Sequence, residues 1–241
     1  MKKLFAILFA ASMAVANYAQ TNVQLFYDFG SVGTACPNQR TNRVAATIEH
    51  LSFDRFGSNF FFIDLDFGCN PNDPRESPFG AYIEASRSFC FWGETKAKDL
   101  SLHIEYNGGL GLFKGGGYSI NHAALAGIEY MLHTQDYRYT LDLQLLYRYD
   151  HGLDVAVPMQ FTAVWGMNDI FKCKGLSFSG YIDLYDGGRM FAFTSEPQVW
   201  YNVGQHFGCE HLFVGTEIEF SYNFCGSGFM CNPCLGLKWQ F

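Results

Sequence analysis

Two pairs of acidic residues have a spacing that could support acid–base chemistry. Asp64 with Asp66, and Glu217 with Glu219, are two positions apart, so in a strand each pair lies on one face about 7 Å apart. Paired carboxylates at such separations can cleave glycosidic bonds. Catalysis would also need one carboxyl with a raised pKa and a cleft that excludes water, and a water-filled channel offers neither. We therefore expect these pairs not to form an enzyme site.

Ser119 and His122 are a second combination with chemical potential. His122 shares its parity with Tyr118, Ile120 and Ala124, which would turn it toward lipid. A lipid-facing Ser and His could form an outer-membrane lipase or deacylase. On a regular strand, however, residues three positions apart face opposite sides, so these two side chains should diverge and cannot share a proton. The pattern favours a histidine near the membrane interface over a catalytic pair.

The eight cysteines could bind metal or form disulfides. Cys231 and Cys234 have the spacing of half a zinc or redox motif, but no second half and no nearby His accompany them. We predict no metal site and no other cofactor. Cys36 and Cys69 fall in the first two long connections, where a disulfide would form if their Cα atoms lie within about 7 Å. The other predicted places are a strand end for Cys90, periplasmic turns for Cys173 and Cys209, and the last outer connection for Cys225, Cys231 and Cys234.

The elements that hold these residues are predicted to be strands, because apolar residues recur with a period of two. From Asn59 to Phe67 one face is apolar and the other carries carboxylates, and Tyr137 to Asp150 alternates in the same way. No amphipathic helix produces this order. The predicted strands number about twelve: 23–29, 43–54, 59–67, 79–89, 100–112, 118–130, 137–150, 155–165, 176–184, 191–201, 212–222 and 235–241.

Strand length distinguishes a membrane barrel from a soluble sandwich, the main alternative. Most of the segments are longer than the roughly 5–6 residues of an average strand and suit a tilted crossing of a bilayer. Aromatic residues gather at the strand ends, as interfacial girdles do. The examples are Tyr118 with Tyr130, Tyr137 with Tyr149, and Trp239 with Phe241. We predict an all-β fold, an antiparallel transmembrane β-barrel of about twelve strands.

Both ends of the chain indicate export to an outer membrane. Lys2 and Lys3 precede an apolar run from Leu4 to Val15, with cleavage predicted after Ala16 or Ala19. The predicted division is a signal peptide at 1–19 and one barrel domain at 20–241. The alternating end that closes on Phe241 is similar to the C-terminal signal that the barrel-assembly machinery recognises. We expect the protein in the outer membrane of a double-membraned bacterium, surrounded by lipid.

Closing such a sheet turns its polar parity inward, because a bilayer cannot satisfy charges or an open edge. Acidic residues outnumber basic ones in this parity, and the chain carries a net charge of −7 with no basic block, which argues against nucleic acid as a partner. An acidic lumen repels anions, and its aromatic rings can stack on flat solutes such as sugars or nucleosides. On parity alone, the candidate solute contacts include Glu105, Arg148, Asp183, Trp200 and Glu217.

Four short stretches resemble a known family. Phe60–Asp64 after Gly57, with Leu25–Phe29, resembles strands of the Tsx-like nucleoside channels, and Tyr82–Ser86 resembles the next strand of that family. Glu196–Tyr201 is similar to a Bacteroidetes branch of uncharacterised relatives. The resemblance implies a monomeric twelve-stranded barrel that passes nucleosides through a narrow lumen. By motif position it implies substrate binding by Phe26, Asp28, Phe62, Asp64, Tyr82 and Glu84.

The chain departs from the better-known members in its eight cysteines, its short outer connections and its loop between Phe67 and Phe79. These differences leave the barrel intact and bear on the substrate. We predict a channel, not an enzyme, for passive and selective diffusion of nucleosides or similar small neutral solutes. Two alternatives stay open: a plugged structural or surface-interaction barrel, and a lipid-modifying enzyme. The enzyme would need a Ser, a His and an acid or amide that converge on one outward face.

Overall fold

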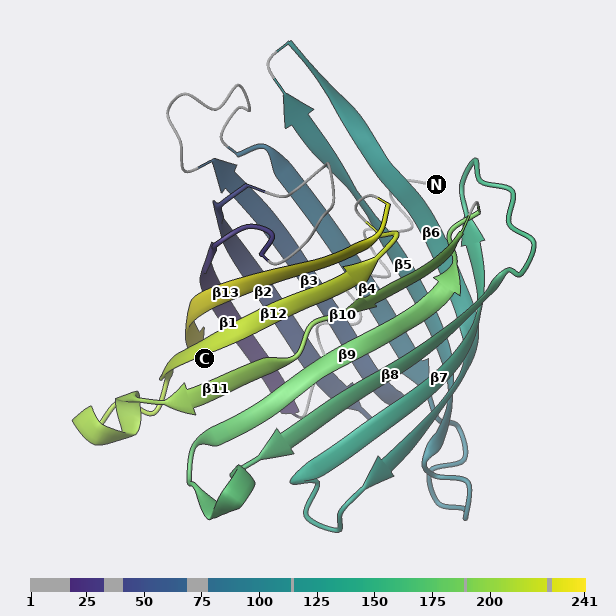
Figure 1. Ribbon diagram of the computed structural model, residues 1–241. Helices are drawn as coiled ribbons and strands as arrows, with labels where there is room; N and C mark the ends of the chain where they lie inside the picture. Colours follow the sequence, from purple (N-terminus) through teal and green to yellow (C-terminus); the bar gives the residue numbers. More distant parts are fainter. Residues whose placement is uncertain (1–17, 33–40, 69–77, 114, 189, 225–226) are drawn as a thin grey trace, which may run out of the picture.

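The computed structural model describes residues 18–32, 41–68, 78–113, 115–188, 190–224 and 227–241. Thirteen antiparallel strands form one sheet that closes on itself, because β1 pairs with both β2 and β13 (Figure 1). The strands are β1 (Tyr18–Asp28), β2 (Arg43–Asp54), β3 (Gly57–Gly68), β4 (Gly80–Phe89), β5 (Leu100–Phe113), β6 (Gly116–His133), β7 (Tyr139–Asp150), β8 (Met159–Asn168), β9 (Leu176–Asp186), β10 (Phe191–Ser195), β11 (Gln198–Asn202), β12 (Leu212–Tyr222) and β13 (Phe229–Gln240).

The thirteen segments occupy twelve positions around the barrel, since β10 and β11 both lie between β9 and β12. The interruption falls at Glu196 and Pro197, where the proline ring supplies no N–H to the ladder. The Pro197 carbonyl still accepts a hydrogen bond from Ile218 at 3.1 Å, and Ser195 donates its hydroxyl to Tyr181 O at 2.7 Å. The prediction of a closed antiparallel barrel of about twelve strands is confirmed.

An even number of positions places the start of β1 and the end of β13 at one end of the barrel, here called the terminal end. The connections after β2, β4, β6, β8 and β11 also lie there. Two of them contain single 3₁₀ turns, at Ile170–Lys172 and Gly204–Phe207. The connections after β1, β3, β5, β7, β9 and β12 lie at the other end, here called the far end.

The two faces of the wall alternate as the sequence predicts. On β1, Val23, Leu25 and Tyr27 are 38%, 50% and 41% exposed on the outside, whereas the residues between them are buried inside. An outward apolar face rimmed by aromatic rings is the surface that a bilayer covers. No helix among the described residues is long and apolar enough to cross a membrane.

Several strand boundaries differ from the prediction, among them the starts of β7, β8 and β13. β8 begins at Met159 and not at Val155, because the N–H groups of Ala156 and Val157 donate to Asp186 instead of a strand partner. Tyr137 precedes β7 and occupies a left-handed turn conformation, with φ of 53°. β13 begins at Phe229, earlier than predicted.

The early start of β13 corrects the placement of two cysteines. Cys231 and Cys234 lie within this strand and not in the last outer connection. Among the described residues, Cys90, Cys173, Cys209 and Cys231 are free thiols. Three predictions concern positions outside the described residues: the suggested pair Cys36 and Cys69, the signal segment up to residue 17, and Cys225.

One irregularity interrupts the ladder between β5 and β6. Asn107 pairs with Ala123 and Gly109 pairs with Ile120, so two residues of β6 face the single residue Gly108. This is a β-bulge, which bends a strand and turns its side chains to a new face. The bulge lies toward the far end, where β6 extends past the end of β7.

Candidate functional site

Four carboxylates converge in the lumen from facing walls of the barrel. Asp64 on β3, Glu105 on β5 and Asp183 on β9 all lie within electrostatic range of Glu84 on β4. Because β9 is five strands from β4 around the twelve positions, these side chains reach across the interior. We call Asp64, Glu84, Glu105 and Asp183 the carboxylate cluster.

Hydroxyl groups orient three members of the cluster. Thr47 donates to Asp64 at 2.5 Å, and Thr162 donates to Asp183 at 2.5 Å. Tyr82, two residues from Glu84 on β4, donates its phenol hydroxyl to that carboxylate at 2.7 Å. Each hydroxyl projects inward from the same strand or the adjacent one, so the pairing register fixes these contacts.

Positive charge compensates the cluster only in part. Among the described residues, His103 is the one basic side chain at ion-pair distance from a member, with its Nε2 3.1 Å from Glu105. The guanidinium of Arg148 lies within electrostatic range of Asp183, but its hydrogen bonds go to other groups. It donates to both carboxylate oxygens of Asp150 at 2.7 and 2.8 Å and lies 4.0 Å above the Tyr185 ring. The middle of the lumen is therefore acidic.

An aromatic ladder lies beside the cluster. The ring centroids of Phe60 and Phe62 are 6.1 Å apart, as are those of Phe62 and Tyr82. Phe62 is the pairing partner of Glu84, and Asp64 is that of Tyr82. The register thus brings together four of the residues implied by the family resemblance.

The remaining candidates lie in other parts of the interior. Phe26 and Trp200 pack against each other with ring centroids 5.6 Å apart and are only 3% and 0% exposed. Lys238 lies 4.3 Å above the Trp200 ring, and Glu217 accepts a hydrogen bond from Gln198 at 2.6 Å. In this arrangement the two rings fill their part of the lumen and offer no free face to a solute.

Asp28 belongs to an ion-pair network near the far end. Arg43 on β2 bridges Asp28 on β1 at 3.1 Å and Asp66 on β3 at 2.8 Å. The contact joins three consecutive strands across their inner face. A solute-binding role for Asp28 stays a prediction.

A buried network around His103 was missed by sequence reasoning. Its Nδ1 lies 2.9 Å from Glu129, which also accepts hydrogen bonds from Ser88 at 2.8 Å and Gln144 at 3.3 Å. Inward parity identifies each residue as facing the lumen. Only the pairing register shows that side chains from β4, β5, β6 and β7 meet. Within the described chain, no three His, Cys, Asp or Glu side chains form a potential metal site.

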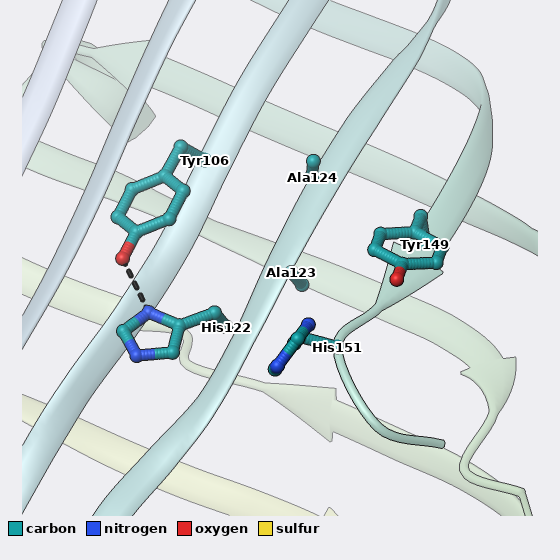
Figure 2. A pocket seen from close by; sticks show the side chains of 6 residues that line it. All are labelled: Tyr106, His122, Ala123, Ala124, Tyr149 and His151. Carbon is teal, nitrogen blue, oxygen red and sulfur yellow. Dashed lines mark hydrogen bonds between the residues drawn. The ribbon is translucent and has the colours of Figure 1, made fainter. Parts of the chain in front are cut away.

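The outer face holds a polar group that contradicts the prediction for Ser119 and His122. Ser119 Oγ lies 3.2 Å from His122 Nε2. Tyr106 Oη contacts His122 Nδ1 at 2.5 Å (Figure 2). The prediction that the two side chains diverge was wrong because the bulge opposite Gly108 adds a residue to β6 and reverses its parity. Adjacent glycines inside a strand, Gly108 and Gly109, were the available signal.

Residues 19–241 match a protein family described as a domain of unknown function, DUF5020. The chain belongs to this family. No curated protein matches the chain. The family description names no substrate, so the resemblance to Tsx-like channels enters only as part of a proposal.

Three solved structures are similar to this chain over most of its length. The high-pH structure of OprB from Pseudomonas putida has 8% identity and a TM-score of 0.44, with 97% of this chain and 96% of that chain covered. OpdQ from Pseudomonas aeruginosa has 11% identity and a TM-score of 0.40, with 92% and 97% covered. A bacterial polysaccharide outer membrane secretin has 8% identity and a TM-score of 0.34, with 94% and 99% covered. The barrel fold is established by the strand pairing of the chain itself.

Proposed function

We propose that the mature chain is a monomeric outer-membrane channel for passive diffusion of small neutral or cationic solutes, nucleosides among them. The observation that carries the proposal is the carboxylate cluster beside the rings of Phe62 and Tyr82 in the middle of a closed barrel. The proposed channel uses no cofactor and no energy source. Its insertion would proceed through the barrel-assembly machinery, with Phe241 at the periplasmic end.

The chemistry of the cluster suits a polar solute with one flat face. Carboxylates repel anions and accept hydrogen bonds from sugar hydroxyls, while ring faces attract a nucleobase by stacking. Phe62 and Tyr82 lie on neighbouring strands with Asp64 and Glu84 directly beside them. A nucleoside could therefore contact a ring and a carboxylate at the same time.

Liposome swelling with the refolded mature protein tests this function. Adenosine and thymidine are expected to enter faster than glucose or a dipeptide of similar size. Phe62→Ala and Asp64→Ala should each slow nucleoside entry several-fold, because both side chains face the lumen. Phe61→Ala is the matched control, since Phe61 pairs with His50, which shares the outward parity of Ile48 on β2.

The outcomes separate the proposal from its rivals. Equal entry of all four solutes would indicate a general pore, and unchanged nucleoside entry in both lumen variants would refute the assigned site. Absence of entry by any solute would refute the channel.

A filled structural barrel is the second candidate, and the burial of inward side chains favours it. Trp200 and Asn232 are 0% exposed, Leu146 is also 0% exposed, and Gln24 is 2% exposed. These residues lie on several strands and close parts of the interior. Conductance in planar bilayers distinguishes the two functions, because a filled barrel passes no steady ionic current.

A further inference from the structure

We propose that the outer face of the barrel carries an acyl-ester hydrolase site, with Ser119 as nucleophile, His122 as general base and Tyr106 as the positioning residue. The substrate class is a fatty-acid ester of a membrane lipid. This inference rests on the lipid-facing surface and does not depend on the lumen or its solute.

The bulge builds the site by placing three outward side chains on neighbouring positions. Ser119 precedes the bulge and His122 is one of its two β6 residues, so they face the same side although they are three residues apart. Gly108 lies opposite and leaves the space that the two rings occupy. A Cβ there would come within 2.7 Å of Tyr106 Oη and 2.8 Å of His122 Nδ1. A glycine at this position is thus required for the contact.

A pocket of about 340 Å³ lies directly beside His122, lined by Tyr106, Ala123, Ala124, Tyr149 and His151 (Figure 2). Ala124 pairs with both Tyr106 and Tyr149, so a small side chain separates two large rings and leaves a cleft between them. The volume is at the lower end of the range of about 300–1,000 Å³ typical of ligand pockets. An acyl chain fits the apolar character of such a cleft.

The site also lies at the depth where lipid esters are found. Tyr147 and Tyr149 end the outward row of β7 near the far end and are 55% and 54% exposed. Rings at a strand end mark the boundary between hydrocarbon and headgroup. The ester bonds of membrane lipids lie at this boundary, so the Ser119 hydroxyl would meet them from the side.

The hydrogen bonds suit one tautomer of the histidine. With the proton on Nδ1, His122 donates to the Tyr106 oxygen, and its Nε2 is free to accept the Ser119 proton across 3.2 Å. Tyr106 thereby takes the orienting role that a carboxylate has in a Ser-His-Asp triad. The Ser119 hydroxyl is also 3.2 Å from the Ile120 carbonyl oxygen, an acceptor that competes with His122 Nε2 for its single proton.

The proposed reaction has two steps. Ser119 Oγ attacks the ester carbonyl carbon, its proton passes to His122 Nε2, and the C–O bond to the lipid alcohol breaks as that alcohol takes the proton. Water then gives a proton to Nε2, attacks the acyl-enzyme and releases the fatty acid with Ser119 restored. Pairing with β7 ends at Ala123, so among the described residues that edge of β6 above His122 has no strand neighbour. Its backbone N–H groups can stabilise the oxyanion.

The test uses the full-length mature barrel refolded in vesicles of phosphatidylcholine, and separately in vesicles that also contain acylated lipopolysaccharide. Fatty-acid release is measured by mass spectrometry, and Ser119 is probed with a fluorophosphonate. Ser119→Ala and His122→Gln should lower release by at least about 100-fold, the usual effect of losing a nucleophile or base. Release from one lipid source only would identify that source as the substrate.

Two control variants keep the result independent of folding. His50→Gln removes another histidine that contacts a hydroxyl, 2.8 Å from Thr21, and should leave release unchanged. Tyr106→Phe should lower kcat about tenfold or more at constant KM, because the ring that lines the pocket is kept while the hydrogen bond that orients the base is lost. Tyr147→Phe should change neither constant. The proposal is overturned if the wild type releases no fatty acid and takes up no probe, or if Ser119→Ala is as active as the wild type.

Discussion

Replacing Arg43 by methionine is expected to destabilise the barrel strongly. Arg43 is 17% exposed and joins Asp28, which is 1% exposed, to Asp66, which is 21% exposed. Methionine keeps much of the side-chain volume but supplies no positive charge. The variant would leave two carboxylates inside the wall without the partner that joins them.

The magnitude follows from the burial of Asp28. Removing one partner of a buried ion pair costs about 3–5 kcal/mol, because the remaining charge is no longer compensated. Asp28→Asn alone should cost about 1–3 kcal/mol, since its Oδ1 can still accept the hydrogen bond from Gly30 N. The double variant should cost less than the sum of the two, with a coupling energy of about 1–3 kcal/mol.

Denaturant unfolding of the refolded protein in lipid vesicles, followed by tryptophan fluorescence, measures these free energies. Arg138→Met is the control, because Arg138 pairs with Asp136 at 3.6 Å on an exposed surface, where about 0–1 kcal/mol is expected. The two residues are not coupled if the losses in unfolding free energy of Arg43→Met and Asp28→Asn sum to that of the double variant within about 0.5 kcal/mol. That result would refute the assigned network.

Three further changes test other parts of the molecule. Trp200→Ala should lower the free energy of unfolding by about 3–5 kcal/mol through the cavity it leaves. Denaturant curves that coincide with those of the wild type would show that neighbouring strands collapse into the space. Gly127→Ala should prevent formation of the heat-modifiable barrel on a gel, because a Cβ would collide with the backbone of β7. In the β6–β7 turn, a hydrogen bond from Thr134 lowers the pKa of Asp136, so its stabilisation is present above about pH 4 and is lost as pH falls through the folded-state pKa. Asp136→Asn should abolish this acid dependence, which is measured by amide hydrogen exchange in the β6–β7 turn. An unchanged dependence of exchange on pH would exclude Asp136 as its source.

The outward site links the fold to a testable activity that differs from the channel function. The lumen variants Phe62→Ala and Asp64→Ala should leave fatty-acid release intact, and Ser119→Ala should leave nucleoside entry intact. The two surfaces are separated by the barrel wall, so each assay reports on one of them. Loss of both functions in a single variant would indicate misfolding.

Alternation along the chain was sufficient to predict the fold class. The period of two places Asp64 and Glu84 on the inner face and Leu25 on the outer face whatever their neighbours are, because the side chains of a strand alternate. The same pattern predicted the number of strands and the acidic interior. The boundary at Val155 was wrong, since local periodicity does not show that Asp186 takes the N–H groups of the following residues.

On strands without a bulge, the sequence by itself determined which residues face the lumen and which face lipid, because parity is a local property of a regular strand. Tertiary structure decided which of them meet. Pairing register places Asp183 near Glu84 across the barrel and packs Phe26 on Trp200, contacts between residues distant in the chain. One extra residue in a bulge reversed the parity of Ser119 relative to His122, because a ladder that gains a residue on one strand exchanges its faces beyond that point.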